Sequence, residues 1–97
     1  MPKNVFHINA ILVVMNKLRD KKVLEQFGQK LKDLRLQKGL TLEQLAFEAD
    51  IELSQVHRAE KGKINPTLTT LIALAKGLNI SISELLAEFN LDIKQIL

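Results

Sequence analysis

The stretch that decides the fold runs from Thr41 to Gly62 and reads TLEQLAFEADIELSQVHRAEKG. Its apolar positions predict two short amphipathic helices joined by a tight turn and followed by a basic loop. Ala46, Asp50 and Val56 stand where a helix-turn-helix motif needs a small residue, a turn residue and a buried apolar residue. In that motif the second helix enters the major groove of DNA, so this spacing indicates major-groove binding.

Local signals mark how this stretch begins and turns. Thr41 precedes Gln44 by three residues, as in a capping box, and Leu40 and Leu45 occupy the positions of a hydrophobic staple. Asp50 is expected in the left-handed backbone region, which Asp tolerates better than most residues. The second helix of the stretch is predicted from about residue 53 to residue 61, with residue 52 at or near its N-cap.

Three more helices are predicted around this stretch. The first covers Leu24–Lys38 and ends before Gly39, a typical left-handed terminating residue. Another follows Thr67 as its N-cap, and a short last helix starts at the capping box of Ser81 and Glu84. The last helix runs through Leu85 and Leu86. Apolar residues at helical spacing form the expected inward faces of the other two: Phe27, Leu31 and Leu34; and Leu68, Leu71, Ile72, Leu74 and Ala75. The sequence therefore predicts a compact all-α domain of five helices.

The first twenty residues allow two readings. Residues 11–14 make a good strand. The other reading is a helix, because six apolar residues fit one helical face: Val5, Ile8, Ile11, Leu12, Met15 and Leu18. The apolar side must pack on the domain or on a second chain, unless the segment is an upstream extension and the natural start is Met15. The predicted organisation is an N-terminal extension (residues 1–20, helix or strand, possible dimer element), a helix-turn-helix domain (residues 21–89) and a C-terminal tail (residues 90–97).

Composition excludes several classes of function. The 97 residues carry a net charge of +3, which favours an anionic partner, and the chain has no Cys for a disulfide or thiolate zinc site. His7 and His57 lie fifty residues apart, without neighbours at metal-ligand spacing. No catalytic motif or glycine-rich phosphate loop is present, so we expect neither an enzyme nor a cofactor. The apolar run Ala10–Met15 is too short to span a bilayer, and we expect a cytoplasmic protein.

With these residues in place, the chain resembles the phage Cro–repressor helix-turn-helix family, also called the xenobiotic-response-element type. The resemblance covers about Leu24–Glu88 and is carried by these residues: Leu34-Arg35, Gly39-Leu40-Thr41, Gln44-Leu45-Ala46, Arg58, Glu60-Lys61-Gly62, Pro66-Thr67-Leu68, Leu71 and Ile80–Leu86. It implies a lambda-repressor-like globule whose third helix enters the major groove. The sequence departs from the family at three positions. The family often has glutamine where Leu42 stands, glycine where Asp50 stands, and serine or threonine where Glu52 stands.

The resemblance and side-chain chemistry together name candidate contacts. Those expected at base edges are Leu53, Ser54, Gln55 and Arg58; Arg can bind guanine, Gln can bind adenine, and Leu can pack on a thymine methyl group. Those expected at phosphates are Leu42 (through its main-chain N–H), Lys61, Lys63, Asn65 and Thr67. The alternative for the four residues expected at base edges is that they are simply exposed to solvent. For Arg58 the alternative is an ion pair with Glu43 or Glu48. By resemblance, Arg35 and Glu60 are expected to form a partly buried structural ion pair.

These residues predict a sequence-specific transcriptional regulator that binds double-stranded DNA as a homodimer on a palindromic operator, without an evident small-molecule effector. The same sequence features are compatible with phage repressors, restriction–modification controllers and antitoxins. The alternative is a protein-interaction module, antitoxin-like or coactivator-like, favoured by an acidic flank: Glu43, Glu48, Asp50 and Glu52. The dimer interface is expected either in the fifth helix with the C-terminal tail (Leu91, Ile93, Ile96 and Leu97) or in the N-terminal segment.

Overall fold

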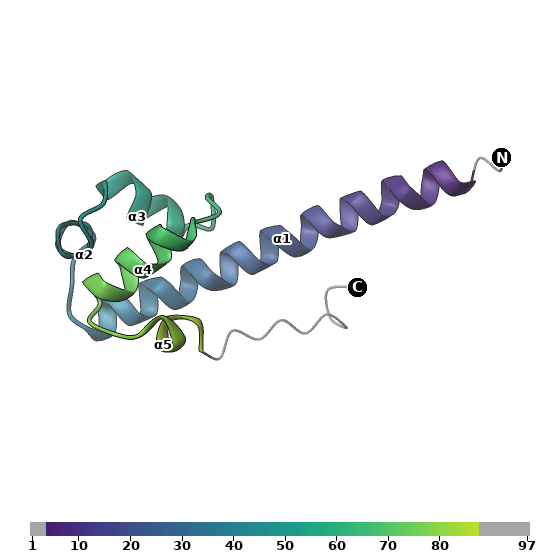
Figure 1. The fold of residues 1–97 in the computed structure, drawn as a ribbon. Helices are drawn as coiled ribbons and strands as arrows, with labels where there is room; N and C mark the ends of the chain where they lie inside the picture. The colour runs from purple at the N-terminus through teal and green to yellow at the C-terminus, as the bar shows by residue number, and fades with distance from the viewer. Residues whose placement is uncertain (1–3, 88–97) are drawn as a thin grey trace.

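Five helices make up all the regular structure of the described residues. The structure, a computed structural model, describes residues 4–87, with side chains from residue 8 onward. The helices are α1 (Asn4–Gln37), α2 (Leu42–Ala49), α3 (Leu53–Glu60), α4 (Leu68–Gly77) and α5 (Ile82–Leu86). The four short helices gather around the C-terminal half of α1, and its N-terminal half projects away from them (Figure 1). The predicted all-α, five-helix fold is confirmed.

The predicted helix boundaries of the short helices rest on capping interactions that the structure contains. Thr41 Oγ1 accepts a hydrogen bond from Gln44 N–H (3.0 Å), and Gln44 Oε1 accepts one from Thr41 N–H (2.8 Å). Ser81 and Glu84 form the same capping box at α5. Asp50 has φ 55° and ψ 46°, so the expected left-handed turn between α2 and α3 is confirmed. Glu52 is the N-cap residue of α3 without a side-chain capping bond.

The hydrophobic core lies between the C-terminal half of α1 and the four short helices. α1 packs on α3 and α5, α2 packs on α3 and α4, and α4 packs on α5. The largest fully buried side chains come from all five helices: Leu31, Leu45, Val56, Leu74, Leu78 and Leu85. Each such side chain contributes roughly 1.5–3 kcal/mol through removal of apolar surface from water. The core therefore fixes α2 and α3 relative to one another and to α1.

A close approach of two backbones positions α3 on α1. A Cβ atom at Gly28 would lie 2.6 Å from the carbonyl oxygen of Ala59 and would also collide with the backbone of Glu60. Only glycine lets the last turn of α3 lie this close to α1. The orientation of α3 thus depends on a residue twenty-five positions before the helix begins.

The structure corrects the predicted start of the first helix. α1 begins at Asn4 rather than at Leu24, and the strand alternative for residues 11–14 is wrong. No Gly or Pro lies between Asn4 and Gly28, so the helix continues through the boundary expected between residues 20 and 21.

The structure also corrects part of the predicted core. Leu68 and Ile72 are 67% and 51% exposed, although both were expected to face inward. The buried face of α4 is centred on Leu74, Ala75 and Leu78, with half-buried Leu71 at its edge. Five apolar positions span more than one face of a helix, so the outer two remain in solvent.

Candidate nucleic-acid interface

The solvent-facing side of α3 carries all four residues predicted to contact bases. Val56 and Ala59, 0% and 1% exposed, hold the opposite side of α3 in the core. The four exposed residues are Leu53, Ser54, Gln55 and Arg58. Among the ion pairs between described residues, none involves Arg58, so its guanidinium is not tied to Glu43 or Glu48. The outer face of α3 therefore presents a free cation and two hydrogen-bonding side chains.

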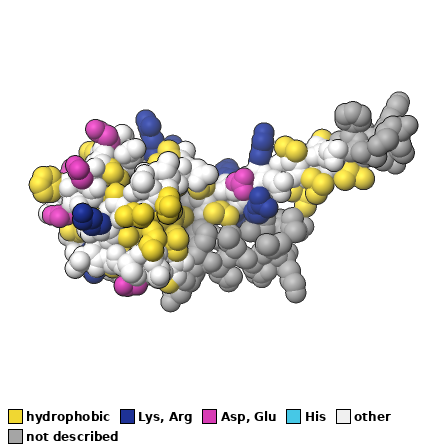
Figure 2. Space-filling view, viewed as in Figure 1, with side chains coloured by type: hydrophobic (Ala, Val, Ile, Leu, Met, Phe, Trp, Pro, Cys, Tyr) yellow, Lys and Arg dark blue, Asp and Glu magenta, His cyan; other side chains and the backbone are white. Residues whose placement is uncertain are grey.

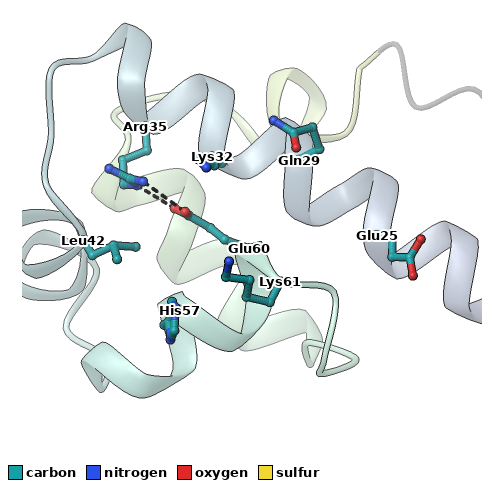
Figure 3. Close-up of a pocket in the computed structure, with 8 residues that line it drawn as sticks. All are labelled: Glu25, Gln29, Lys32, Arg35, Leu42, His57, Glu60 and Lys61. Atoms are coloured by element: carbon teal, nitrogen blue, oxygen red, sulfur yellow. Dashed lines mark hydrogen bonds and ion pairs between the residues drawn. The ribbon is translucent and has the colours of Figure 1, made fainter.

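A cleft of about 370 Å³ lies where α1 faces the start of α2 and the end of α3 (Figure 3). Eight residues line it: Glu25, Gln29, Lys32, Arg35, Leu42, His57, Glu60 and Lys61. The side chains of Arg35 and Glu60 point toward one another from α1 and α3 (Figure 3). Because these two charges neutralise one another, Lys32 and Lys61 supply the remaining positive charge, with Glu25 opposing them.

The ion pair between Arg35 and Glu60 is present with two parallel hydrogen bonds. Arg35 Nε donates to Glu60 Oε2 (2.6 Å) and Arg35 Nη2 donates to Glu60 Oε1 (3.0 Å). The third bond runs from Arg35 Nη1 to the carbonyl oxygen of Leu40 (2.9 Å). The two side chains are 9% and 5% exposed. One guanidinium thereby connects α1, the residue before the α2 cap and the last residue of α3.

This pairing also sets the charge state of Arg35. The hydrogen bond to Glu60 raises the pKa of Arg35 above its usual value, and this outweighs the opposing effect of burial. Arg35 therefore stays charged, and its fork geometry is the one that best matches a carboxylate.

A second cleft, of about 470 Å³, brings the start of α2 beside the start of α3. It is lined by Leu42, Glu43, Glu52, Leu53, Ser54 and His57. The half-buried side chain of Leu42 packs against the core and is apolar, so the main-chain N–H is the only hydrogen-bond donor that this residue has. The first N–H groups of any helix lack an intrahelical acceptor, which leaves them available to an anion. The predicted phosphate residue Leu42 thus lies next to Ser54, a predicted base residue.

The loop after α3 is folded back on that helix. Lys63 N–H donates to the carbonyl oxygen of Arg58 (2.9 Å), and Gly62 adopts a φ of 69° beside Glu25 of α1. Lys61 and Lys63 are both exposed on this ordered loop. Two basic side chains therefore directly follow α3.

Asn65 and Thr67 are exposed, but neither lines the two clefts. The hydroxyl oxygen of Thr67 accepts a hydrogen bond from Thr70 N–H (3.2 Å), so this side chain caps α4. The first cleft thus brings Leu42 and Lys61 together at the end of α3, whereas Asn65 and Thr67, like Lys63, lie outside both clefts.

Two residues of the clefts, Gln29 and Lys32, had no functional role in the sequence prediction, and His57 was expected on the surface, near the backbone of bound DNA if it had a role. Gln29 and Lys32 precede Arg35 at intervals of three residues, and His57 lines both clefts. Because residues three apart lie on one face of a helix, this spacing could have predicted that Gln29 and Lys32 share the face of Arg35. No group of three metal-ligating side chains exists among the described residues, which include His57.

An acidic and apolar surface lies beside the start of α3. Phe47 of α2 is 81% exposed and borders a cavity of about 610 Å³ with Asp50, Glu52 and Leu53. Carboxylates at this end of α3 repel phosphates and attract cations. The surface around α3 is thus divided, with basic residues after the helix and acidic residues before it.

The fold and this surface define a helix-turn-helix domain. The sequence profile of the HTH_3 helix-turn-helix family matches residues 31–85, and the chain belongs to this family. Its fold is of the Cro and phage-repressor type, as predicted.

Similar proteins include regulators of two kinds. Control protein C.MunI of a Mycoplasma species is 38% identical over 64 residues, which are 65% of this chain and 86% of that protein. The immunity repressor protein of Bacillus phage phi105 is 38% identical over 61 residues, 63% of this chain. The chain spans only 42% of the length of that repressor.

A solved structure has the same fold. The restriction-modification controller protein C.AhdI from Aeromonas hydrophila superposes with a TM-score of 0.62 and 42% sequence identity, covering 64% of this chain and 94% of that chain. As for membranes, no helix within residues 4–87 combines the length and the apolar character that a transmembrane segment requires.

Proposed function

We propose that this chain is a sequence-specific, double-stranded-DNA-binding transcriptional regulator that inserts α3 into the major groove. The observation that carries the proposal is the solvent-facing side of α3. There Ser54, Gln55 and Arg58 are exposed, while buried Val56 and Ala59 fix the helix from behind. Hydrogen-bonding side chains on a rigid helix are what reading of base edges requires.

Within this proposal, Arg58 is the main base-reading residue. Its guanidinium is free of ion pairs among the described residues and can donate two parallel bonds to guanine O6 and N7. A bidentate contact of this kind contributes about 1–3 kcal/mol of discrimination against the wrong base. Gln55 and Ser54 are proposed as secondary contacts, and Leu53, 42% exposed, as a contact to a thymine methyl group.

The phosphate backbone is proposed to lie along the residues that flank α3. The main-chain N–H of Leu42, at the start of α2, faces one side, and exposed Lys61 and Lys63 follow the helix on the other. Asn65 and Thr67 extend this set toward α4. The Arg35–Glu60 pair is proposed to brace the recognition helix, because it ties the end of α3 to α1.

The proposed operator complex is a homodimer on a palindromic site. One eight-residue helix reaches only a few base pairs, so selectivity requires a second copy. Two-fold symmetry on one face of the duplex places the two α3 helices about 34–36 Å apart. The relatives named as controllers and as an immunity repressor support a regulatory role.

Selection of bound sequences from a random pool of duplex DNA tests the proposal. Wild type, Arg58→Ala and Lys76→Ala are run in parallel, with Lys76 as an exposed cation on α4 away from the site. We expect a palindromic site for wild type and Lys76→Ala, and relaxation at one base of each half-site for Arg58→Ala. If wild type enriches no sequence at moderate salt, the proposed function is wrong.

The alternative function is docking on a protein. Exposed Phe47, with Asp50 and Glu52 around the neighbouring cavity, favours a partner that combines apolar and basic groups. Binding measured against salt concentration separates the two functions. DNA affinity falls with a slope near −0.9 per phosphate contact on a logarithmic plot, and a shallow dependence would favour the protein partner.

A further inference from the structure

The projecting half of α1 carries an apolar surface that the other helices of the described residues leave uncovered. We define the N-terminal stripe as Ile8, Ile11, Leu12, Met15 and Leu18. Four of these residues are 50–57% exposed, and Met15 is partly buried. Hydrophobic side chains line the projecting helix in the space-filling view (Figure 2). Within residues 8–87 these side chains have little tertiary packing, and a helix without such packing is marginal in water.

The stripe faces away from the domain. At about 100° per residue, its centre lies roughly 140° around α1 from Phe27 and Leu31, which pack into the core. Further along the same line the residues become polar and exposed: Lys22, Gln29 and Asp33. Polar residues therefore separate the apolar surface of residues 8–18 from exposed Leu36, the next apolar residue on this line. The four short helices cannot cover residues 8–18 without unpacking from the core.

The stripe is self-complementary if two copies meet in opposite directions. In heptad terms Ile8 and Met15 take position a, and Ile11 and Leu18 take position d. About a two-fold axis at residue 13, Ile8 then faces Leu18 of a second copy and Ile11 faces its Met15. An isologous contact of this kind needs no other surface.

Charge decides between the two directions of pairing. Residues 17–22 carry four cations and one carboxylate: Lys17, Arg19, Lys21, Lys22 and Asp20. A parallel pair would bring these two basic segments together, with Lys22 against Lys22 at position a. An antiparallel pair keeps them at opposite ends of the contact.

We propose that the N-terminal stripe is a self-association surface that pairs antiparallel with the stripe of a second copy of this chain. The exposed stripe residues of two copies amount to on the order of 900 Å² of surface, somewhat below the lower end of stable interfaces at about 1,200 Å². The association is therefore weak and depends on protein concentration.

This contact goes beyond the proposed operator dimer. Residues 13–28 span about 22 Å at 1.5 Å per residue, so antiparallel pairing sets the two α3 helices on the order of 45 Å apart. That distance exceeds the spacing of half-sites one turn apart. The stripe is thus an additional contact, and it forms without DNA.

Sedimentation equilibrium of the full chain without DNA tests the proposal from about 5 to 500 µM, a range that suits a contact of this size. For wild type we expect the mass to rise with concentration above the 11.0 kDa of one chain. Ile11→Lys breaks the stripe and should show a much smaller rise. Val13→Lys is the matched control, because Val13 is similarly exposed (52% against 57%) and lies on the other side of the same helix.

Each other result overturns the proposal. Wild type that stays at the mass of one chain has no such contact, and Ile11→Lys that associates like wild type uses another surface. Equal loss in both lysine variants, with circular dichroism showing the helix intact, would mean that the stripe is not the specific surface. Because DNA is absent, none of these results bears on the proposed DNA-binding function.

A crosslinking experiment tests the direction of pairing. The natural chain has no Cys, so Ile8→Cys and Leu18→Cys are single reactive sites. With a short bis-maleimide, the mixture of the two variants should crosslink more than either variant alone. Efficient crosslinking of Ile8→Cys with itself would indicate a parallel pair and overturn the antiparallel arrangement.

Discussion

The two halves of α1 have similar apolar spacing but different surroundings. In the C-terminal half, Phe27 and Leu31 are 5% and 0% exposed beneath the four short helices. In the N-terminal half, Ile8 and Ile11 are 56% and 57% exposed. Periodicity therefore identifies an apolar face without identifying the surface that covers it. The C-terminal half packs against the four short helices of its own domain. For the N-terminal half we propose another copy of the chain as the partner.

The largest expected effect is a difference in stability between substitutions in the two halves of α1. Leu31→Ala should lower the free energy of unfolding by about 3–5 kcal/mol, because it removes methyl groups from a filled core. Ile11→Ala, at an exposed position, should change it by about 0.5 kcal/mol or less. Urea denaturation at low protein concentration measures both, and equal losses would contradict the assignment of the core.

The next effect concerns the ion pair that holds α3 on the C-terminal half of α1. Glu60→Ala should lower the free energy of unfolding by about 3 kcal/mol, because it leaves Arg35 without a partner in a mostly buried position. Glu25→Ala, at an exposed carboxylate of the same cleft, is the control and should have little effect. An unchanged melting temperature for Glu60→Ala would exclude a stabilising role for the pair.

A smaller effect is expected where the two helices touch. Gly28→Ala places a Cβ against the carbonyl oxygen of Ala59 and should cost about 1–3 kcal/mol in stability. The end of α3 must shift to make room, so DNA affinity should fall more than it does for exposed Gln29→Ala. Thermal unfolding and DNA titration of the two variants check this; full stability in Gly28→Ala would show that α3 relaxes freely.

The smallest effect sharpens the division of charge around α3. Glu52→Gln removes one carboxylate beside the candidate base contacts and should strengthen DNA binding at low salt. The gain should be less than about 1 kcal/mol, because this charge is exposed and screened. Titrations at two salt concentrations test it; weaker binding by Glu52→Gln would imply that Glu52 itself contacts DNA.

Local signals explain why much of the fold was predictable. Capping at Thr41 and Ser81 and the left-handed turn at Asp50 depend on residues within a few positions, and the structure contains all three. The predicted start of α1 was wrong because residues 4–23 contain no Gly or Pro that would mark a helix boundary. Leu68 and Ile72 were misassigned because α4 has more apolar residues than its buried face needs.

The candidate site was predictable only in part, because its geometry depends on distant residues. The exposed face of α3 followed from the inward positions of Val56 and Ala59. Two features depend on how α1 packs against helices that follow much later in the sequence. They are the close approach at Gly28 and the cleft that Lys32 shares with Leu42 and His57. Spacing alone carried no information on that packing.

The central claim is that α3 reads bases while the loop after it holds phosphates. Affinities for the selected site and for a random duplex, measured across a range of salt for wild type, Arg58→Ala and Lys63→Ala, test it most directly. Arg58→Ala should lose affinity for the selected site alone, by about 1–3 kcal/mol per contact. Lys63→Ala should lose affinity for both duplexes and reduce the salt slope by about one. Equal losses on both duplexes for Arg58→Ala would contradict base reading by α3.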